Sequence, residues 1–259
     1  MTTTRKEAAT IAKKTAKKKK ARSTKGQLGL LAMARQFGAR RTGKATVFSD
    51  LFGDPFYCFQ LAQALCPDMD IDLEDVALLT INNVLVGKPY NDLGMLVGDK
   101  LLILVEAQAT WTVNILIRLL LYLAQMYLEL IIAMGWNVYG TKPIPLPMPE
   151  SFVVYTGDRK DRPEELRLST EFFGGKEGAV EVKVKVLYGD GEGDIIDQYV
   201  AFCHVLDDQY RKHGYTVEAV RETIRICRDQ DVLKEYLSKR EKEVIDIMLG
   251  SADTSSTFS

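Results

Sequence analysis

A long apolar segment from Thr112 to Trp136 constrains the fold of this chain more than any other part of its sequence. It is a little longer than the ~20 residues that a helix needs to cross a bilayer. An Arg and a Glu within an isolated membrane span would each cost about 2.5 to 3.5 kcal/mol. On a helix that advances about 100° per residue, the polar residues of the segment form one narrow stripe: Asn114, Arg118, Gln125 and Glu129. The sequence therefore predicts a helix in a soluble core, with one face turned toward a site, and no membrane partner.

Two extended stretches precede this helix, and polar residues lie at their ends. The first begins at Asp92, and the second, Leu101–Gln108, is apolar until it reaches Glu106 and Gln108. Because residues i and i+2 of a strand share a face, Glu106 and Gln108 are expected on the same face. Burying such groups costs several kcal/mol unless a partner such as a metal ion satisfies them, which makes this strand end a candidate site.

The turn between the two strands decides whether Asp92 joins that face. A two-residue loop would pair Val97 with Lys100 and place Asp92 on the opposite face. A three-residue loop pairs Val97 with Leu101 and sets Asp92 directly opposite Glu106, with a glycine in the loop to relieve the backbone. A functional site here requires the three-residue loop or an equivalent bulge.

Two carboxylates and an amide oxygen at one point would suit Mg²⁺, a hard cation that keeps positions for water and phosphate. Such an ion lowers the pKa of a bound water and stabilises charge on a phosphodiester, which is the chemistry of hydrolysis. Taken as spacing alone, the pattern is more often that of a solvated strand end.

Stretches spread over most of the chain carry a further pattern: residues 48–54 (FSDLFGD), 90–94 (YNDLG), 104–111 (LVEAQATW), Asn114, Ile115, Arg118, Tyr122, 155–158, 198–199 and 240–245. Together, over roughly residues 46–248, they resemble the Rpn family of recombination-promoting nucleases and transposases, which belongs to the PD-(D/E)XK nuclease superfamily. The resemblance implies an α/β fold of mixed α+β type, with a restriction-endonuclease-like αβββαβ core. It also implies a metal-dependent DNA endonuclease with a role in recombination, transposition or phage defence.

Carried over residue by residue, the resemblance makes Asp92 and Glu106 the metal-binding acids. It places Gln108 where most of the superfamily has a lysine that orients the attacking water, and the Rpn branch commonly carries glutamine there. A further metal-binding acid usually comes from the first helical region, where we favour Asp50 over Asp54. The implied cofactor is Mg²⁺, with Mn²⁺ or Ca²⁺ as substitutes in vitro, and the implied partner is DNA.

On the long helix, the role of Arg118 has two open alternatives. Arg118 either contacts a phosphate bidentately or pairs with Glu129 or a strand carboxylate. In the functional interpretation Tyr122 hydrogen-bonds a ligand or a water, and Asn114 contacts nucleic acid. We interpret Gln125 and Glu129 as structural.

Charge is distributed unevenly along the chain. Residues 1–25 carry ten Lys or Arg and one Glu, a net of +9, whereas the rest carries −10, so that the whole comes to −1. We interpret residues 1–45 as a flexible basic arm that binds nucleic acid through its densest cluster, Lys17, Lys18, Lys19 and Lys20. A solubilising extension is the open alternative. Contact of DNA with Arg159, Lys160 and Arg162 is less favoured, because acids surround them.

Periodicity predicts the remaining elements: a helix over 56–65, an extended segment over 76–86, a strand over 152–155, a strand over 181–188 at a sheet edge, and helices from 194 with breaks at 213–214 and near 231. We therefore divide the chain into the arm, a nuclease-like core over 46–193, a helical region over 194–249 and a disordered tail at 250–259. The N-terminus has no apolar signal core and the four cysteines no CxxC spacing, which favours the cytoplasm.

Two other classes of function compete with the endonuclease. One is a catalytically inactive nucleic-acid-binding protein that retains the fold, and the other is a structural interaction module. A homodimer is compatible with each of the three.

Overall fold

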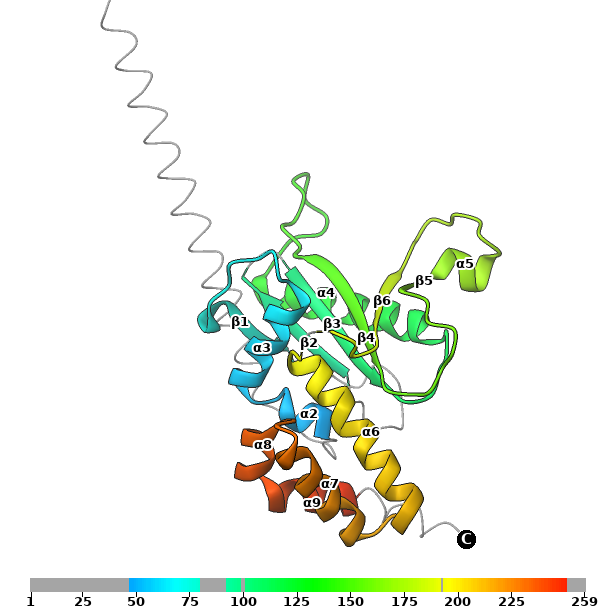
Figure 1. Ribbon diagram of the computed structural model, residues 1–259. Coiled ribbons are helices and arrows are strands. Elements are labelled where there is room, and N and C mark those ends of the chain that lie inside the picture. The colour runs from blue at the N-terminus through cyan, green and yellow to red at the C-terminus, as the bar shows by residue number, and fades with distance from the viewer. Residues whose placement is uncertain (1–46, 80–91, 99–100, 192, 251–259) are drawn as a thin grey trace, which may run out of the picture.

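A six-stranded mixed sheet forms the centre of the protein (Figure 1). The computed structural model describes residues 47–79, 92–98, 101–191 and 193–250. The strands lie in the order β1-β2-β3-β4-β6-β5, with the bounds β1 Val76–Leu79, β2 Asp92–Val97, β3 Leu101–Gln108, β4 Met148–Tyr155, β5 Glu165–Arg167 and β6 Lys183–Leu187. The pairs β1–β2, β2–β3 and β5–β6 are antiparallel, whereas β3–β4 and β4–β6 are parallel. The fold is therefore mixed α/β, of the α+β kind that the sequence predicts.

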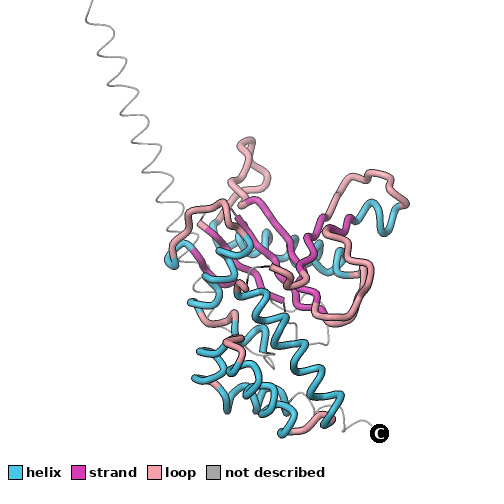
Figure 2. The backbone as a smooth tube through the Cα atoms, viewed as in Figure 1, coloured by secondary structure: helices cyan, strands magenta, loops and turns pink. Residues whose placement is uncertain are grey.

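Helices cover both faces of this sheet (Figure 2). They are α2 Val47–Leu51, α3 Pro55–Leu65, the 3₁₀ turn η1 Leu73–Asp75, α4 Ile115–Met134, α5 Leu168–Phe173, α6 Ile195–His213, α7 Val217–Asp229, α8 Lys234–Lys239 and α9 Glu241–Gly250. On one face lies α4, and on the other lie α2, α3 and α6 (Figure 1). The connection from β3 to β4 runs through α4, as parallel strands require a long crossover.

The register of β2 and β3 follows the three-residue loop. Val97 is paired with Leu101, and Asp92 is paired directly with Glu106, which is the one of the two possible registers that a functional site requires. Gly98 follows β2 with a φ of 63°, in the left-handed region that glycine adopts without strain. Its N–H donates to the carbonyl oxygen of Asp75 at 2.8 Å, which ties the turn to the start of β1.

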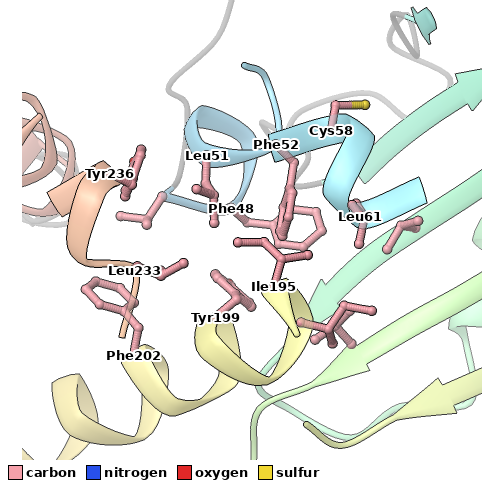
Figure 3. Close-up of a cluster of buried hydrophobic side chains, with 14 of the residues drawn as sticks. Phe48, Leu51, Phe52, Cys58, Leu61, Ile195, Tyr199, Phe202, Leu233 and Tyr236 are labelled. Carbon is pink, nitrogen blue, oxygen red and sulfur yellow. The ribbon is translucent and has the colours of Figure 1, made fainter. Parts of the chain in front are cut away.

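The core on the face covered by α2, α3 and α6 joins the two ends of the described chain. Phe48 of α2 lies edge-on against Phe52 at 4.9 Å and against Tyr199 of α6 at 5.2 Å, measured between ring centroids. Figure 3 shows these rings beside Leu233 and Tyr236 near the start of α8. The helical region after residue 193 therefore shares one hydrophobic core with the sheet and with α2 and α3.

The core on the second face lies under α4. Leu119, Tyr122 and Met126 recur at helical spacing and pack in one cluster with Val153 and Val184 of the sheet. Among the described helices, α4 alone is long and apolar enough to cross a membrane by length and composition. Here one face of it is buried against the sheet, and the helix ends before Gly135, which has a φ of 62°.

One expectation about the sheet needs correction, and two short elements were not predicted. The strand over 181–188 was expected at the edge of the sheet, but β5 pairs outside β6 and forms the edge. A three-residue strand such as β5 gives no periodic signal, so neither it nor α5 was predicted. The expected helices over 56–65 and 112–136 are confirmed as α3 and α4, and the breaks at 213–214 and near 231 separate α6, α7 and α8. Residues 1–46, 80–91 and 251–259, and with them the basic arm and most of the tail, lie outside the description.

Candidate functional site

The ends of β2 and β3 bring three of the predicted site residues to one face of the sheet. Asp92 and Glu106 are directly paired, and residues paired across antiparallel strands share a face. Gln108, two residues beyond Glu106, lies on that face as well. On the parallel neighbour β4, the partners of Glu106 and Gln108 are Val153 and Tyr155, which belong to the core under α4. The three positions therefore lie on the α4 face of the sheet.

Of these three residues, the structure describes the side chain of Gln108, whereas the side chains of Asp92 and Glu106 lie outside the described part. Its carboxamide is buried, with 8% of the residue exposed. The amide oxygen Oε1 accepts a hydrogen bond from Nη2 of Arg118 at 3.1 Å. The amide Nε2 donates to the carbonyl oxygen of Thr112 at 3.4 Å, so both ends of the carboxamide are held.

Arg118 lies one turn into α4 and is half-buried. Its contact with Gln108 joins the helix to the end of β3 at the predicted site. The partner in this contact is a neutral amide, so the two alternatives left open by the sequence, a phosphate and an acidic partner, stay predictions. Glu129 accepts a hydrogen bond from Nε2 of Gln125 at 2.9 Å, a contact within the helix.

Tyr122 on α4 and Asn114 just before it differ in exposure. Tyr122 is fully buried among the residues under the helix, with 0% exposed. Its helical position lies close to that of Leu119 and Met126, and its hydrogen bond to a ligand or a water stays a prediction. Asn114 precedes α4 and is exposed, and its side chain makes no capping hydrogen bond. It remains available to a ligand at the start of the helix.

Asp50 does not lie on the α4 face. It belongs to α2 in the opposite layer, where Oδ2 accepts a hydrogen bond from the Tyr236 hydroxyl at 2.7 Å. Oδ1 forms an ion pair with Nη2 of Arg240 at 2.9 Å, and the Asp50 side chain is 13% exposed. The expected third metal ligand is therefore an anchor between α2 and the C-terminal helices. Asp54, the other candidate, caps α3 by accepting from the N–H of Phe56.

A row of aromatic rings borders Gln108, and the sequence did not predict it. Tyr155 lies edge-on between Trp111 at 5.3 Å and Tyr188 at 6.0 Å, measured between centroids. The guanidinium of Arg159 lies 4.2 Å from the Trp111 centroid, and that of Arg162 lies 4.3 Å from the Tyr188 centroid. Cation–π contacts of this kind hold each arginine over its ring.

Each of these arginines also has an acidic partner. Arg159 forms an ion pair with Asp161 at 2.8 Å, and Arg162 forms one with Asp190 at 2.6 Å. The partners partly neutralise the two guanidinium groups, which agrees with the low weight given to DNA contact at this loop. The aromatic row lies next to Gln108, whose partner on the neighbouring strand is Tyr155.

Among the side chains that the structure describes, no group of three or more His, Cys, Asp and Glu residues is close enough to hold a metal ion. Lys17, Lys18, Lys19 and Lys20 lie outside the described residues. The candidate site is thus defined by the pairing of Asp92 with Glu106 and by the Gln108–Arg118 hydrogen bond. The chain matches no protein-family model, and no curated protein or solved structure is significantly similar to it.

Proposed function

We propose that this protein is a metal-dependent DNA endonuclease of the Rpn type, built on a restriction-endonuclease-like core. The observation that carries the proposal is the register of β2 and β3, which pairs Asp92 directly with Glu106 on the α4 face. The order of the elements supports it, because α3, the antiparallel strands β1 to β3, α4 and β4 follow one another as αβββαβ. The two paired acids lie on the sheet face that α4 covers, and α4 carries the positively charged Arg118.

The donor set at this strand end fits a divalent cation by its chemistry. Carboxylate oxygens are the hard ligands that Mg²⁺ prefers, and Mn²⁺ and Ca²⁺ accept the same donors. Asp92 and Glu106 would hold the ion. When bound, Mg²⁺ supplies a Lewis acid for the phosphodiester and lowers the pKa of a bound water.

Gln108 and Arg118 together replace the lysine of most PD-(D/E)XK nucleases. Gln108 lies at the position of that lysine but is neutral, and its amide oxygen holds the guanidinium of Arg118 at 3.1 Å. A guanidinium donates through a planar fork that matches phosphate oxygens. In this proposal Gln108 is the positioning residue, and Arg118 provides the positive charge at the phosphate.

Affinity for DNA is assigned to the basic arm. Residues 1–25 carry +9 against −10 on the rest of the chain, so the body alone would repel phosphates. Lys17, Lys18, Lys19 and Lys20 would release counterions on binding, and the affinity would fall steeply with salt. The family resemblance implies a role in recombination, transposition or phage defence, and the cysteine spacing favours a cytoplasmic location.

Nicking of supercoiled plasmid by the full chain tests the proposal. We expect nicking with Mg²⁺, none with EDTA, and none by Asp92→Asn, which removes a metal-binding carboxylate. Arg118→Ala should slow nicking about 10²- to 10³-fold, as the loss of one charge-stabilising donor does elsewhere, whereas Arg118→Lys should retain part of the rate. Asp208→Asn, which changes an exposed carboxylate on α6, is the matched control. Equal nicking by wild type and Asp92→Asn would end the assignment.

A second candidate is a nucleic-acid-binding protein that keeps the fold without turnover. The observation that favours it is the glutamine at position 108, whose amide is held at both ends by Arg118 and Thr112. The same experiment separates the two candidates. Retardation of DNA on a gel, at a protein concentration that gives no nicking with Mg²⁺ or Mn²⁺, would establish the second candidate over the first.

A further inference from the structure

The face of α4 that points away from the sheet is apolar along the helix. Its exposed positions follow one another at intervals of three or four residues and form one stripe: Ile117, Leu121, Ala124, Leu128 and Ile132. Leu128 is 50% exposed and Ile132 is 69% exposed. This outer stripe extends for about 22 Å at 1.5 Å per residue. A continuous exposed apolar surface of this kind marks an interaction site.

The outer stripe is symmetric about its own midpoint, beside Ala124. Ile117 and Ile132 lie equally far from that point, and so do Leu121 and Leu128. Suppose that two copies of the helix run antiparallel about a two-fold axis at this point. Ile117 of one copy then lies level with Ile132 of the second copy, and Leu121 lies level with Leu128. Such matching is the condition for an isologous interface, in which the same surface serves both subunits. The small side chain at the centre lets the two helices approach closely.

Charges beside the outer stripe are complementary under the same symmetry. Arg118 and Glu129 lie on one flank of α4, about 20° apart around the helix. A two-fold axis across an antiparallel helix pair brings the two equivalent flanks to the same side. Arg118 of one copy then lies about two residues, or roughly 3 Å along the axis, from Glu129 of the second copy. Positions of opposite charge are thus level with each other at both ends of the interface, while within one chain Arg118 donates to Gln108 and Glu129 accepts from Gln125.

We infer that the outer stripe of α4 docks a second copy of this chain, antiparallel about a two-fold axis beside Ala124. The dimer does not depend on nuclease activity, and a chain without turnover would form it equally well. It buries the apolar stripe that the monomer leaves exposed, and it places the two candidate sites on opposite ends of one helix pair.

Sedimentation velocity of the full chain at tens of micromolar tests the interface. We expect a particle of twice the chain mass of 29.1 kDa. Leu121→Lys or Leu128→Glu alone should weaken the dimer at least tenfold, because each sets a charge against a leucine. Both substitutions in one chain should restore it, because the paired positions then carry opposite charges. Leu73→Glu changes a leucine of η1 with a similar exposure, 47%, and should leave the dimer intact.

A disulfide trap tests the register without introducing charge. Ala124→Cys should give a covalent dimer on oxidation, because the two copies of this position meet at the axis. Ala133→Cys, at another exposed alanine of α4, should not, since its two copies lie about 25 Å apart along the helices. Equal trapping at both positions, or a wild-type chain that sediments as a monomer, would overturn the inference. A monomer that pellets with phosphatidylcholine–phosphatidylglycerol vesicles would overturn it in favour of a lipid surface.

Discussion

A buried glutamine and a half-buried arginine form the described part of the candidate site. The amide oxygen of Gln108 accepts from Arg118, so a hydrogen bond joins the end of a strand to the first turn of the following helix. A lysine at position 108 would set an ammonium beside that guanidinium in a buried place, where like charges repel strongly. The residue at one position thus limits the residue at the other, and within this pair the positive charge lies on the helix.

Asp50 offers a test of whether a site acid is a ligand or an anchor. It accepts from the Tyr236 hydroxyl and pairs with Arg240, both from the C-terminal helices. Burial, and then the bond to Asp50, raises the pKa of Tyr236, so the hydroxyl stays protonated as the donor. We expect Asp50→Asn to lower the free energy of unfolding by about 1–2 kcal/mol, because the Arg240 side chain is 37% exposed and solvent screens the ion pair.

The measurement is urea unfolding, paired with plasmid nicking well below the unfolding midpoint. Tyr236→Phe is the matched variant, since it removes the hydroxyl alone and should cost about 1 kcal/mol. Nicking by Asp50→Asn should stay at the wild-type rate. A lost rate with unchanged stability would return Asp50 to the metal site.

The sequence allowed Gln108 and Arg118 to be chosen as candidates but did not predict their contact. The distance between them depends on the path of residues 109–114, which have no periodic pattern. The burial of Tyr122 was not predictable from the sequence either, because its angular position borders both the polar stripe and the buried face. Only the packing of α4 on the sheet decides between the two, and it buries the ring completely.

The hairpin of β2 and β3 shows how much an element can determine from sequence. Glycine at position 98 and the apolar runs on either side allowed the three-residue loop to be proposed, and the register pairs Val97 with Leu101. By contrast β5 and α5 were missed, because three and six residues are too few for a pattern to repeat. The edge of the sheet was misplaced for the same reason.

Gly98 carries a prediction at this scale. Its φ of 63° lies where a side chain of an L-residue meets its own backbone. We expect Gly98→Ala to lower the free energy of unfolding by about 1–2 kcal/mol, and Gly98→Asn to cost less, since asparagine tolerates this region better. Urea unfolding measures both.

Gly178→Ala is the matched control for the hairpin variants. An added Cβ at Gly178 would meet its nearest atom, the carbonyl oxygen of Val180, only at 3.8 Å, which is ordinary contact. Its stability should be unchanged or slightly raised, because alanine narrows the unfolded ensemble. An equal loss at both glycines would show that the conformation of Gly98 is not the cause.

The whole molecule is held together by a core that the order of the sequence does not suggest. The helical region after residue 193 was expected as a separate part, yet Tyr199, Phe202 and Tyr236 pack against α2 and α3 in one cluster with the sheet. Periodicity identifies the apolar face of each helix, but it does not say which other face it meets. Contacts between residues far apart in sequence therefore had to come from the structure.

Two cysteines test this shared core directly. Cys58 of α3 and Cys227 of α7 are buried in the same cluster, at 1% and 0% exposure. Burial raises the pKa of the Cys227 thiol to about 12, so at pH 8 almost none of it is the reactive thiolate. Both thiols should resist alkylation in the native protein. Because one core unfolds as a unit, both should become labelled at the same urea concentration.

Brief alkylation at each urea concentration, followed by mass spectrometry of the two cysteine peptides, measures the two midpoints separately in the unmodified chain. Coincident midpoints would mean that the nuclease-like core and the helical region fold cooperatively. A truncation after residue 193 would then expose Phe48, Phe52 and their neighbours, and it would unfold the sheet as well. Labelling of Cys227 at clearly lower urea would instead mean that α7 separates first. In that case the helical region would be a part that opens independently of the paired acids, and the shared cluster would contribute little to holding Asp92 and Glu106 in register.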